Sequence, residues 1–285
     1  MSTANMSTAN MSTPTHAVPH RTSALPILRR TLLDGWRGLV GWALGIIAVL
    51  ALYLPLYPTL QGPEITELID QLPAELVQTL GYDDMASGAG YAQASFFGLL
   101  GFVLITIASI GWGAAAIAGQ EETGRLELTL AHAVGRVQVA LESAAALIVK
   151  LLLLGGVVFG LLTVMSPAFE LDLEPANILA TTLAWVGLGA LAGTTALAAG
   201  ALTGRRVWAL GAGAAVAVLG YAFDAVGKMN DGLEWLRNLS PFAWAYGSEP
   251  LANGVDWGGL GLLWGVSALL VAVAAWALSR RDVLG

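Results

Sequence analysis

The sequence has no cysteine and only three histidines. Without cysteine, the chain forms no disulfide and no thiolate metal site, and it offers no thiol nucleophile. The histidines, His16, His20 and His132, are too scattered for a metal site or a histidine-based catalytic triad. A phosphate-binding loop is also missing, because Gly227-Lys228 lacks the upstream glycine and the following serine or threonine of that motif. We therefore expect a chain that is not an enzyme and binds no metal or cofactor of its own.

Charged residues are also scarce, at 12% of the chain, and they leave six long uncharged runs. A membrane-spanning helix needs roughly 20 mostly apolar residues, so the runs predict an all-α membrane protein with six transmembrane helices. The third helix lengthens if it begins near Ser143, which places Lys150 inside it and within snorkelling reach of the headgroups. The runs cover residues 38–63, 85–120, 151–169, 175–204, 207–223 and 257–279, and the fifth is the shortest.

Arginine collects at one set of helix ends. Because basic residues are retained on the cytoplasmic side of membrane proteins, this pattern predicts that both termini are cytoplasmic. Fourteen of the twenty acids instead lie in the three outer loops, so the net charge of −7 belongs to the outer side and argues against nucleic-acid binding. Lys228 and Arg237 also fall outside, and Lys150 lies within a helix. Ten of the thirteen basic residues fall inside: Arg21, Arg29, Arg30, Arg37, Arg125, Arg136, Arg205, Arg206, Arg280 and Arg281.

Three parts follow one another along the chain. Residues 1–22, which begin with a repeated Met-Ser-Thr-Ala-Asn pentad, are too polar for a signal peptide, and we interpret them as a disordered tail. Residues 23–37 carry an apolar stripe at helical spacing and predict a short helix lying in the inner membrane interface, with a solvated helical leader as the alternative. Residues 38–285 form the six-helix membrane domain. The stripe consists of Leu25, Leu28, Leu32 and Trp36.

Small residues recur at four-residue spacing within the spans, as in Ser109 with Gly113 and Gly189 with Gly193. This spacing favours the close approach of helices in lipid. In the first outer loop, residues 64–81 predict two short helices that cap the membrane domain.

The segment between the second and third spans, residues 119–136, combines an apolar stripe with charge near its start. Leu126, Leu130 and Val134 share one helical face. A short amphipathic helix held between two membrane helices can dock into a groove on a soluble partner. A plain interfacial turn is the alternative interpretation. The charged residues are Glu121, Glu122, Arg125 and Glu127.

This segment resembles the corresponding loop of the permease subunits of type-2 ATP-binding-cassette exporters. Gly124 falls one place earlier than in many members, and Ala133 stands where proline is usual. Residues 238–242, with 250–254, are similar to the family's outer segment before the last span, and residues 280–283 to its usual ending. The residues that match the loop signature are Glu121, Glu122, Leu126, Glu127, Leu130, Ala131 and Arg136.

The resemblance implies the type-2 exporter permease fold, with an elbow helix, a coupling helix and an outer re-entrant hairpin. It also implies a half-transporter of a prokaryotic plasma membrane, which pairs with a second permease, identical or related. Two separate ATPase subunits would bind ATP and Mg²⁺ and drive export. The implied functional residues are Arg29, Arg30 and Trp36 in the elbow; Glu121, Glu122, Arg125, Leu126, Glu127, Leu130, Val134 and Arg136 in the coupling segment; and Asn238, Ser240, Pro241 and Phe242 in the outer gate.

The same resemblance places an apolar substrate path along the second and fifth spans, suited to an apolar or amphiphilic drug-like or antibiotic-like compound. We further expect Glu121 and Glu127 to contact basic residues on the ATPase. Two other functions are considered. A gradient-driven carrier or channel would use Lys150 and Asp224 in its pathway, since intramembrane charge is costly and usually functional. A membrane scaffold would transport nothing.

Overall fold

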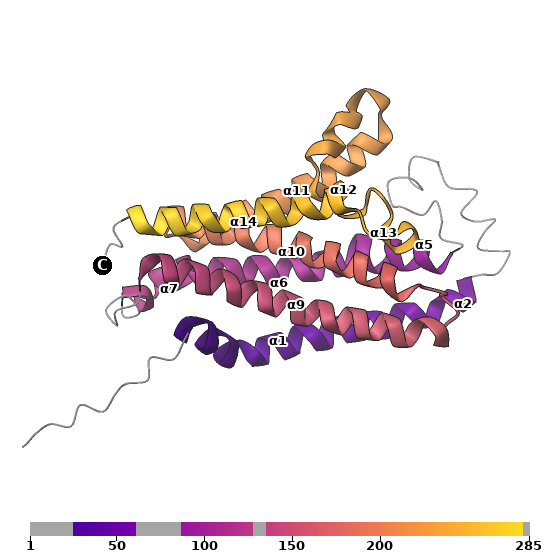
Figure 1. Ribbon diagram of the computed structural model, residues 1–285, viewed down its shortest axis with the longest axis horizontal. Coiled ribbons are helices and arrows are strands. Elements are labelled where there is room, and N and C mark those ends of the chain that lie inside the picture. The colour runs from indigo at the N-terminus through magenta and orange to yellow at the C-terminus, as the bar shows by residue number, and fades with distance from the viewer. Residues whose placement is uncertain (1–24, 61–86, 128–134, 282–285) are drawn as a thin grey trace, which may run out of the picture.

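The computed structural model describes residues 25–60, 87–127 and 135–281. The predicted disordered tail, the two capping helices of the first outer loop, Leu130 and Val134 lie outside this part of the chain. Helices dominate it (Figure 1). In chain order they are α1 (Pro26–Tyr53), η1 (Leu54–Leu56), α2 (Tyr57–Leu60), α5 (Gly88–Ala92), η2 (Gln93–Leu100), α6 (Gly101–Ala116), α7 (Ala118–Glu122), α9 (Arg136–Ala168), α10 (Pro175–Thr203), α11 (Arg206–Met229), η3 (Asp231–Leu239), α12 (Pro241–Tyr246), α13 (Pro250–Asn253) and α14 (Trp257–Arg280).

Six helical segments of the described residues are long and apolar enough to cross a membrane, which confirms the prediction of an all-α protein with six spans. Three of them extend well beyond their uncharged runs. The first begins at Pro26, before Arg29, Arg30, Asp34 and Arg37. The third begins at Arg136, before Glu142 and Lys150, and the fifth continues past Asp224 to Met229. The last two extensions are possible because Glu142 and Asp224 find polar partners on neighbouring turns or helices, and Lys150 packs its ammonium on the Trp112 ring, as described below. A charge therefore does not mark the end of a span when another side chain or a helix terminus offsets it.

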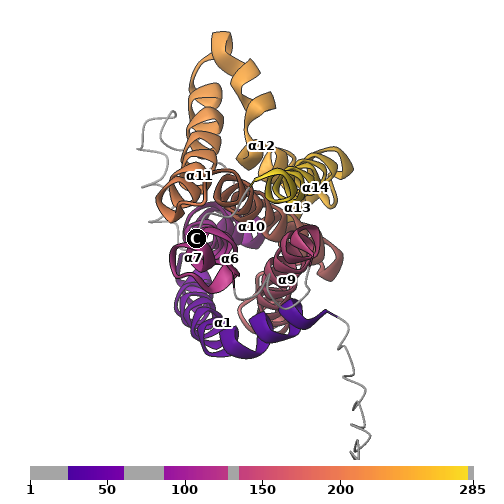
Figure 2. The same ribbon diagram turned by 90° about the vertical axis from the view of Figure 1, so that its left-hand side faces the viewer.

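The spans lie side by side and divide the molecule into two ends (Figure 1). One end, here called the basic end, contains α7, the starts of α1, α9 and α11, and the ends of α10 and α14. At the other, the hairpin end, α2, α5 and α13 lie close to one another, and the last turns of α11 project from the bundle together with η3 (Figures 1 and 2). Helix α10 is the central span, with 78% of its most apolar stretch buried.

A close helix contact joins α6 and α10 through the small residues that the sequence singled out. A Cβ on Gly113 would lie 2.1 Å from the carbonyl oxygen of Gly193, and a Cβ on Gly193 would lie 3.0 Å from the carbonyl oxygen of Ser109. Gly189 similarly leaves room for Ile105. Larger residues would force these two backbones apart. The prediction of close approach is therefore confirmed, and the contact fixes the register of α6 on α10.

The first helix runs without interruption from Pro26 to Tyr53, through the predicted boundary between residues 37 and 38. The segment predicted as a separate elbow and the first span thus form one helix. Figure 2 shows its first turns crossing the basic end of the bundle beside α9, before the helix follows the bundle axis. Arg29, Arg30 and Trp36 are exposed along these first turns.

Candidate functional site

The segment after the second span begins differently from the prediction. Glu121 and Glu122 belong to the end of α7, which continues the second span, and Thr123 and Gly124 form a turn. Gly124 has a φ of 67°, a left-handed conformation that glycine adopts without steric cost. Helical backbone resumes at Arg125. The prediction of one amphipathic helix starting at Glu121 is therefore wrong at its start, because the turn breaks it.

Beyond the turn, one side of the segment faces the protein and the other faces out. The Leu126 side chain is fully buried, in a cluster with Ala140, Leu197 and Leu278, as its place on the predicted apolar face requires. Glu127 and Arg125 are exposed. The structure thus presents charge outward from a segment that is anchored by an apolar contact.

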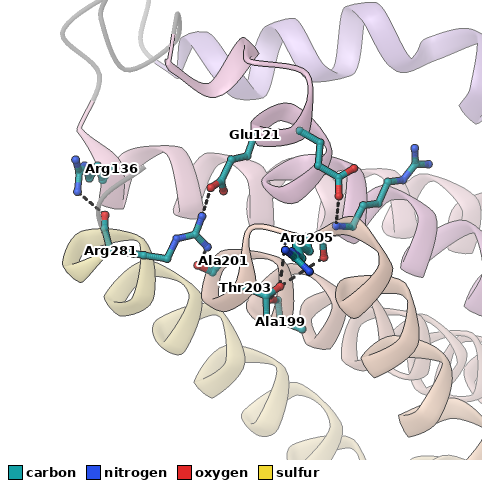
Figure 3. Close-up of polar contacts among 9 residues, drawn as sticks. Glu121, Arg136, Ala199, Ala201, Thr203, Arg205 and Arg281 are labelled. Carbon is teal, nitrogen blue, oxygen red and sulfur yellow. Dashed lines mark hydrogen bonds and ion pairs between the residues drawn. The ribbon is translucent and has the colours of Figure 1, made fainter. Parts of the chain in front are cut away.

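Arg281 joins the loop after the second span to the end of the chain (Figure 3). One of its guanidinium nitrogens forms an ion pair with Glu121 Oε1, and the other donates to the carbonyl oxygen of Ala201 at 2.9 Å. That carbonyl belongs to the last turn of α10, where oxygens lack helical partners and a cation is favourable. The Glu121 side chain is only 14% exposed. Arg281 therefore uses one planar group to hold two different helix ends.

Two further contacts complete this arrangement at the basic end. Arg136, at the start of α9, donates to the carbonyl oxygen of Arg281 at 2.6 Å. Glu122 accepts a hydrogen bond of 2.8 Å from the backbone N–H of Arg206, the first residue of α11, and a carboxylate there stabilises the positive end of the helix. We call the set Glu121, Glu122, Arg136, Arg206 and Arg281 the clasp (Figure 3). It fastens α7 to the ends of α9, α10, α11 and α14.

Gly204 provides the space that the clasp requires. It ends α10 in a left-handed conformation with a φ of 67°. A Cβ at this position would lie 2.4 Å from a guanidinium nitrogen of Arg281 and 2.6 Å from Glu121 Oε1. Both the backbone conformation and the ion pair therefore select glycine.

Glu142 on α9 was not among the residues singled out from the sequence, yet it holds the start of α1. Its carboxylate accepts from the backbone N–H groups of Ile27 at 2.7 Å and Leu28 at 3.0 Å, and from the Gln138 side chain at 2.6 Å. Helix α1 has no capping side chain of its own, so Glu142 supplies the cap from a neighbouring helix. In the sequence, the signal for this role was a single acid within a mostly apolar stretch. In the structure, Glu142 is 2% exposed.

The predicted outer-gate residues cluster where α12 meets α11. Ser240 is fully buried; its hydroxyl donates to the carbonyl oxygen of Gly220 at 2.5 Å and accepts from the backbone N–H of Ala243 at 3.0 Å. Gly220 also leaves room for Pro241, because a Cβ at position 220 would lie 3.1 Å from the proline ring. Asn238 contributes its backbone carbonyl, which accepts from the Trp244 indole at 2.8 Å. These contacts seat the N-terminus of α12 on the fifth span.

Phe242 connects the same region to the second span through edge-on ring contacts. Its ring centroid lies 5.3 Å from that of Phe102, 5.2 Å from that of Tyr221 and 5.0 Å from that of Tyr246. The interplanar angles are 83°, 81° and 77°, an arrangement that aromatic pairs favour. Burial raises the pKa of the Tyr246 phenol well above its usual range. We call these four rings, Phe102, Tyr221, Phe242 and Tyr246, the aromatic seal.

A small pocket lies behind this seal, between α6, α10, α11 and α12. Its interior has room for little more than a single water molecule. Thr106 Oγ1 lies in its lining, is buried, and has no hydrogen-bond partner among the described residues. The second span, the fifth span and the gate residues thus share one apolar pocket with a polar group in its wall. The lining residues are Phe102, Thr106, Leu188, Leu191, Ala192, Val216, Ala217, Gly220, Pro241 and Phe242.

Asp224 and Lys150 do not meet. Asp224, near the hairpin end, pairs with Lys228 at 3.0 Å and with Arg237 at 3.4 Å, and these contacts fasten η3 to α11. Lys150 lies against α1 and α6 instead, with its ammonium over the Trp112 ring. Asp224 and Lys150 therefore do not form a shared charged site of the kind that a gradient-driven carrier would use.

Comparison with known proteins bears on the whole of this arrangement. Residues 35–278 match the family described as the multidrug efflux system permease Rv1217c, C-terminal domain. The chain belongs to this family. The match covers all six spans except the outermost turns of the first and last, and six apolar helices fit a permease of the ATP-binding-cassette type. A search among curated proteins found no match. The protein is therefore a multi-pass membrane permease of a multidrug efflux family.

Proposed function

We propose that the chain is the permease half of an ATP-driven exporter, with its basic end in the cytoplasm. The observation that carries the proposal is the clasp. It binds the loop after the second span to the ends of four other helices, so a force applied to that loop is passed to all four of them. Membership of a multidrug efflux permease family supports the direction of transport. ATP hydrolysis is assigned to a partner, since this chain has no phosphate-binding loop.

The ATPase subunits, one for each permease of a pair, dock on the segment after Gly124. Glu127 is the acid best placed for this contact, because it is exposed and lies on the outward side of the segment that Leu126 anchors. Glu121 is better suited to an internal role, since Arg281 occupies its carboxylate. We therefore assign the contact with a basic ATPase surface to Glu127, and the transmission of the motion to Glu121.

The substrate path runs between the second and fifth spans and is closed at the hairpin end by Phe242. Drug-sized ligands occupy pockets of roughly 300–1,000 Å³, so the pocket behind Phe242 must widen before such a compound can pass. Its lining suits an apolar or amphiphilic compound. A second permease, identical or related, completes the path. Separation of Phe242 from Phe102 and Tyr221 is the opening step.

Purification of the tagged chain from its native membranes in mild detergent tests the proposal. We expect a soluble subunit to copurify near stoichiometry, with ATP hydrolysis that vanadate inhibits. Glu127→Lys should insert normally but lose both the copurifying subunit and export, whereas Glu234→Lys, an exposed acid in η3, should behave as wild type. A lone chain without hydrolysis, under conditions that keep known exporters intact, would refute the proposal. Transport driven by a proton or sodium gradient after ATP depletion would then identify a carrier.

A further inference from the structure

Three spans meet around the ammonium group of Lys150. The group lies 5.2 Å from the centroid of the Trp112 ring on α6. On the other side it reaches α1, where a Cβ on Gly35 would lie 2.9 Å from Lys150 Nζ and 3.3 Å from Cε. Lys150 is only 6% exposed. Its stem is therefore buried against α1 and α6, and a Cβ at position 35 would displace the flexible end of the lysine side chain. We call Gly35, Trp112 and Lys150 the lysine notch.

The ammonium group in this notch has no anionic partner among the described residues. No oxygen atom of the described residues forms a hydrogen bond or ion pair with it. The nearby acids are engaged elsewhere: Asp34 pairs with Arg30, and Glu142 caps α1. An ammonium group has three donors, and a cation over an aromatic ring is only weakly attracted to it. The described residues therefore give this ammonium an aromatic contact but no anion, whereas the carboxylates of Glu142 and Asp224 accept hydrogen bonds or form ion pairs.

The position of the notch along α1 indicates what supplies the anion. Gly35 lies between Asp34 and Trp36, in the polar first part of α1, and Trp36 and Arg37 are exposed beside it. Tryptophan and arginine in this arrangement are typical of the membrane–water interface. Lys150 thus extends from within a span to the depth of the lipid headgroups, as long basic side chains do. The group available at that depth is a lipid phosphate.

We propose that the lysine notch binds the phosphate of an anionic phospholipid in the leaflet at the basic end. Lys150 neutralises the phosphate, and the surrounding arginines of α1 select lipids with a net negative charge, because basic residues outnumber acids on these turns. The bound lipid would bridge α1, α6 and α9. This site is separate from the substrate pocket, which is lined by α6, α10, α11 and α12.

Native mass spectrometry of the purified protein titrated with phosphatidylglycerol tests the site. Lys150→Met should weaken the tightest bound lipid by about five- to tenfold, the effect of one basic residue on an anionic lipid. Lys228→Met is the matched control, because Lys228 is the other lysine of the chain and pairs with Asp224 at the opposite end. It should retain wild-type affinity. Phosphatidylcholine should bind the wild type more weakly than phosphatidylglycerol.

Two further variants keep the test decisive if Lys150→Met does not fold. Lys150→Arg preserves the charge and should preserve binding, whereas Gly35→Ala leaves every charge in place but displaces the ammonium and should weaken phosphatidylglycerol binding. Unchanged affinity in Gly35→Ala and Lys150→Met would overturn the proposal. Equal affinity for phosphatidylcholine would also overturn it, as would displacement of the lipid by millimolar inorganic phosphate, which would identify a free anion as the occupant.

Discussion

The clasp offers a direct measurement of how strongly the loop after the second span is fastened to the bundle. Arg281 makes one ion pair, with Glu121, and one hydrogen bond, with the Ala201 carbonyl. A hydrogen bond to a charged group contributes about 1.5–3 kcal/mol, and removal of one partner leaves the other unpaired. Because Arg281 is 25% exposed and Glu121 14% exposed, water compensates part of the loss. We expect Arg281→Gln and Glu121→Gln each to destabilise the protein by about 2 kcal/mol.

The double variant separates the ion pair from the other losses. If the two groups interact, Glu121→Gln with Arg281→Gln should cost less than the sum of the single changes, by about 1–2 kcal/mol. Equilibrium unfolding in mixed detergent micelles, followed by circular dichroism, measures the free energy of unfolding of the wild type, the two single variants and the double variant. Arg280→Gln is the matched control, because Arg280 is exposed and forms no ion pair with the described residues. Strict additivity of the two clasp substitutions, within about 0.5 kcal/mol, would refute the reasoning.

Three other changes test separate parts of the structure. Gly204→Ala should destabilise the protein more than Gly124→Ala in the same unfolding assay. Both positions have a φ of 67°, but only at Gly204 would a Cβ meet the clasp, so equal effects would show that backbone conformation alone matters. Glu142→Ala should remove the cap of α1 at a cost of about 1–2 kcal/mol and accelerate amide hydrogen exchange in its first turn, and unchanged exchange there would contradict the assignment. A cysteine introduced as Thr106→Cys would be the only thiol of the chain, and it should resist labelling until Phe242→Ala opens the seal; labelling before the seal is removed would show that the pocket is not closed.

The membrane architecture was predictable because it depends on local composition. Each uncharged run corresponds to a span, and the four-residue spacing of Gly189 and Gly193 correctly indicated a tight helix contact. The end of the fifth span was harder to predict, since Asp224 interrupts the run. The structure carries the helix past Asp224 because Lys228 lies one turn later on the same face. That i, i+4 pair is visible in the sequence and could have extended the prediction.

The clasp could not be predicted, because it depends on contacts between distant parts of the chain. Glu121 and Arg281 are 160 residues apart, and each looked like an independent exposed charge. The sequence therefore assigned Glu121 to a partner protein, whereas the structure pairs it internally. The cap of α1 by Glu142 is missed for the same reason, since helix capping is normally sought in the residues next to the helix start.

A mechanical link between the basic end and the pocket follows from α10. The helix has 29 residues and is therefore about 43 Å long. Its last turn is held by Arg281, its middle is fixed to α6 by the contact between Gly113 and Gly193, and its Leu188 and Leu191 line the pocket behind Phe242. We expect α10 to move as a rigid body, so that a displacement of the clasp shifts a wall of the pocket without any change inside the helix. Loosening the clasp should therefore impair export more than it impairs insertion or ATPase binding.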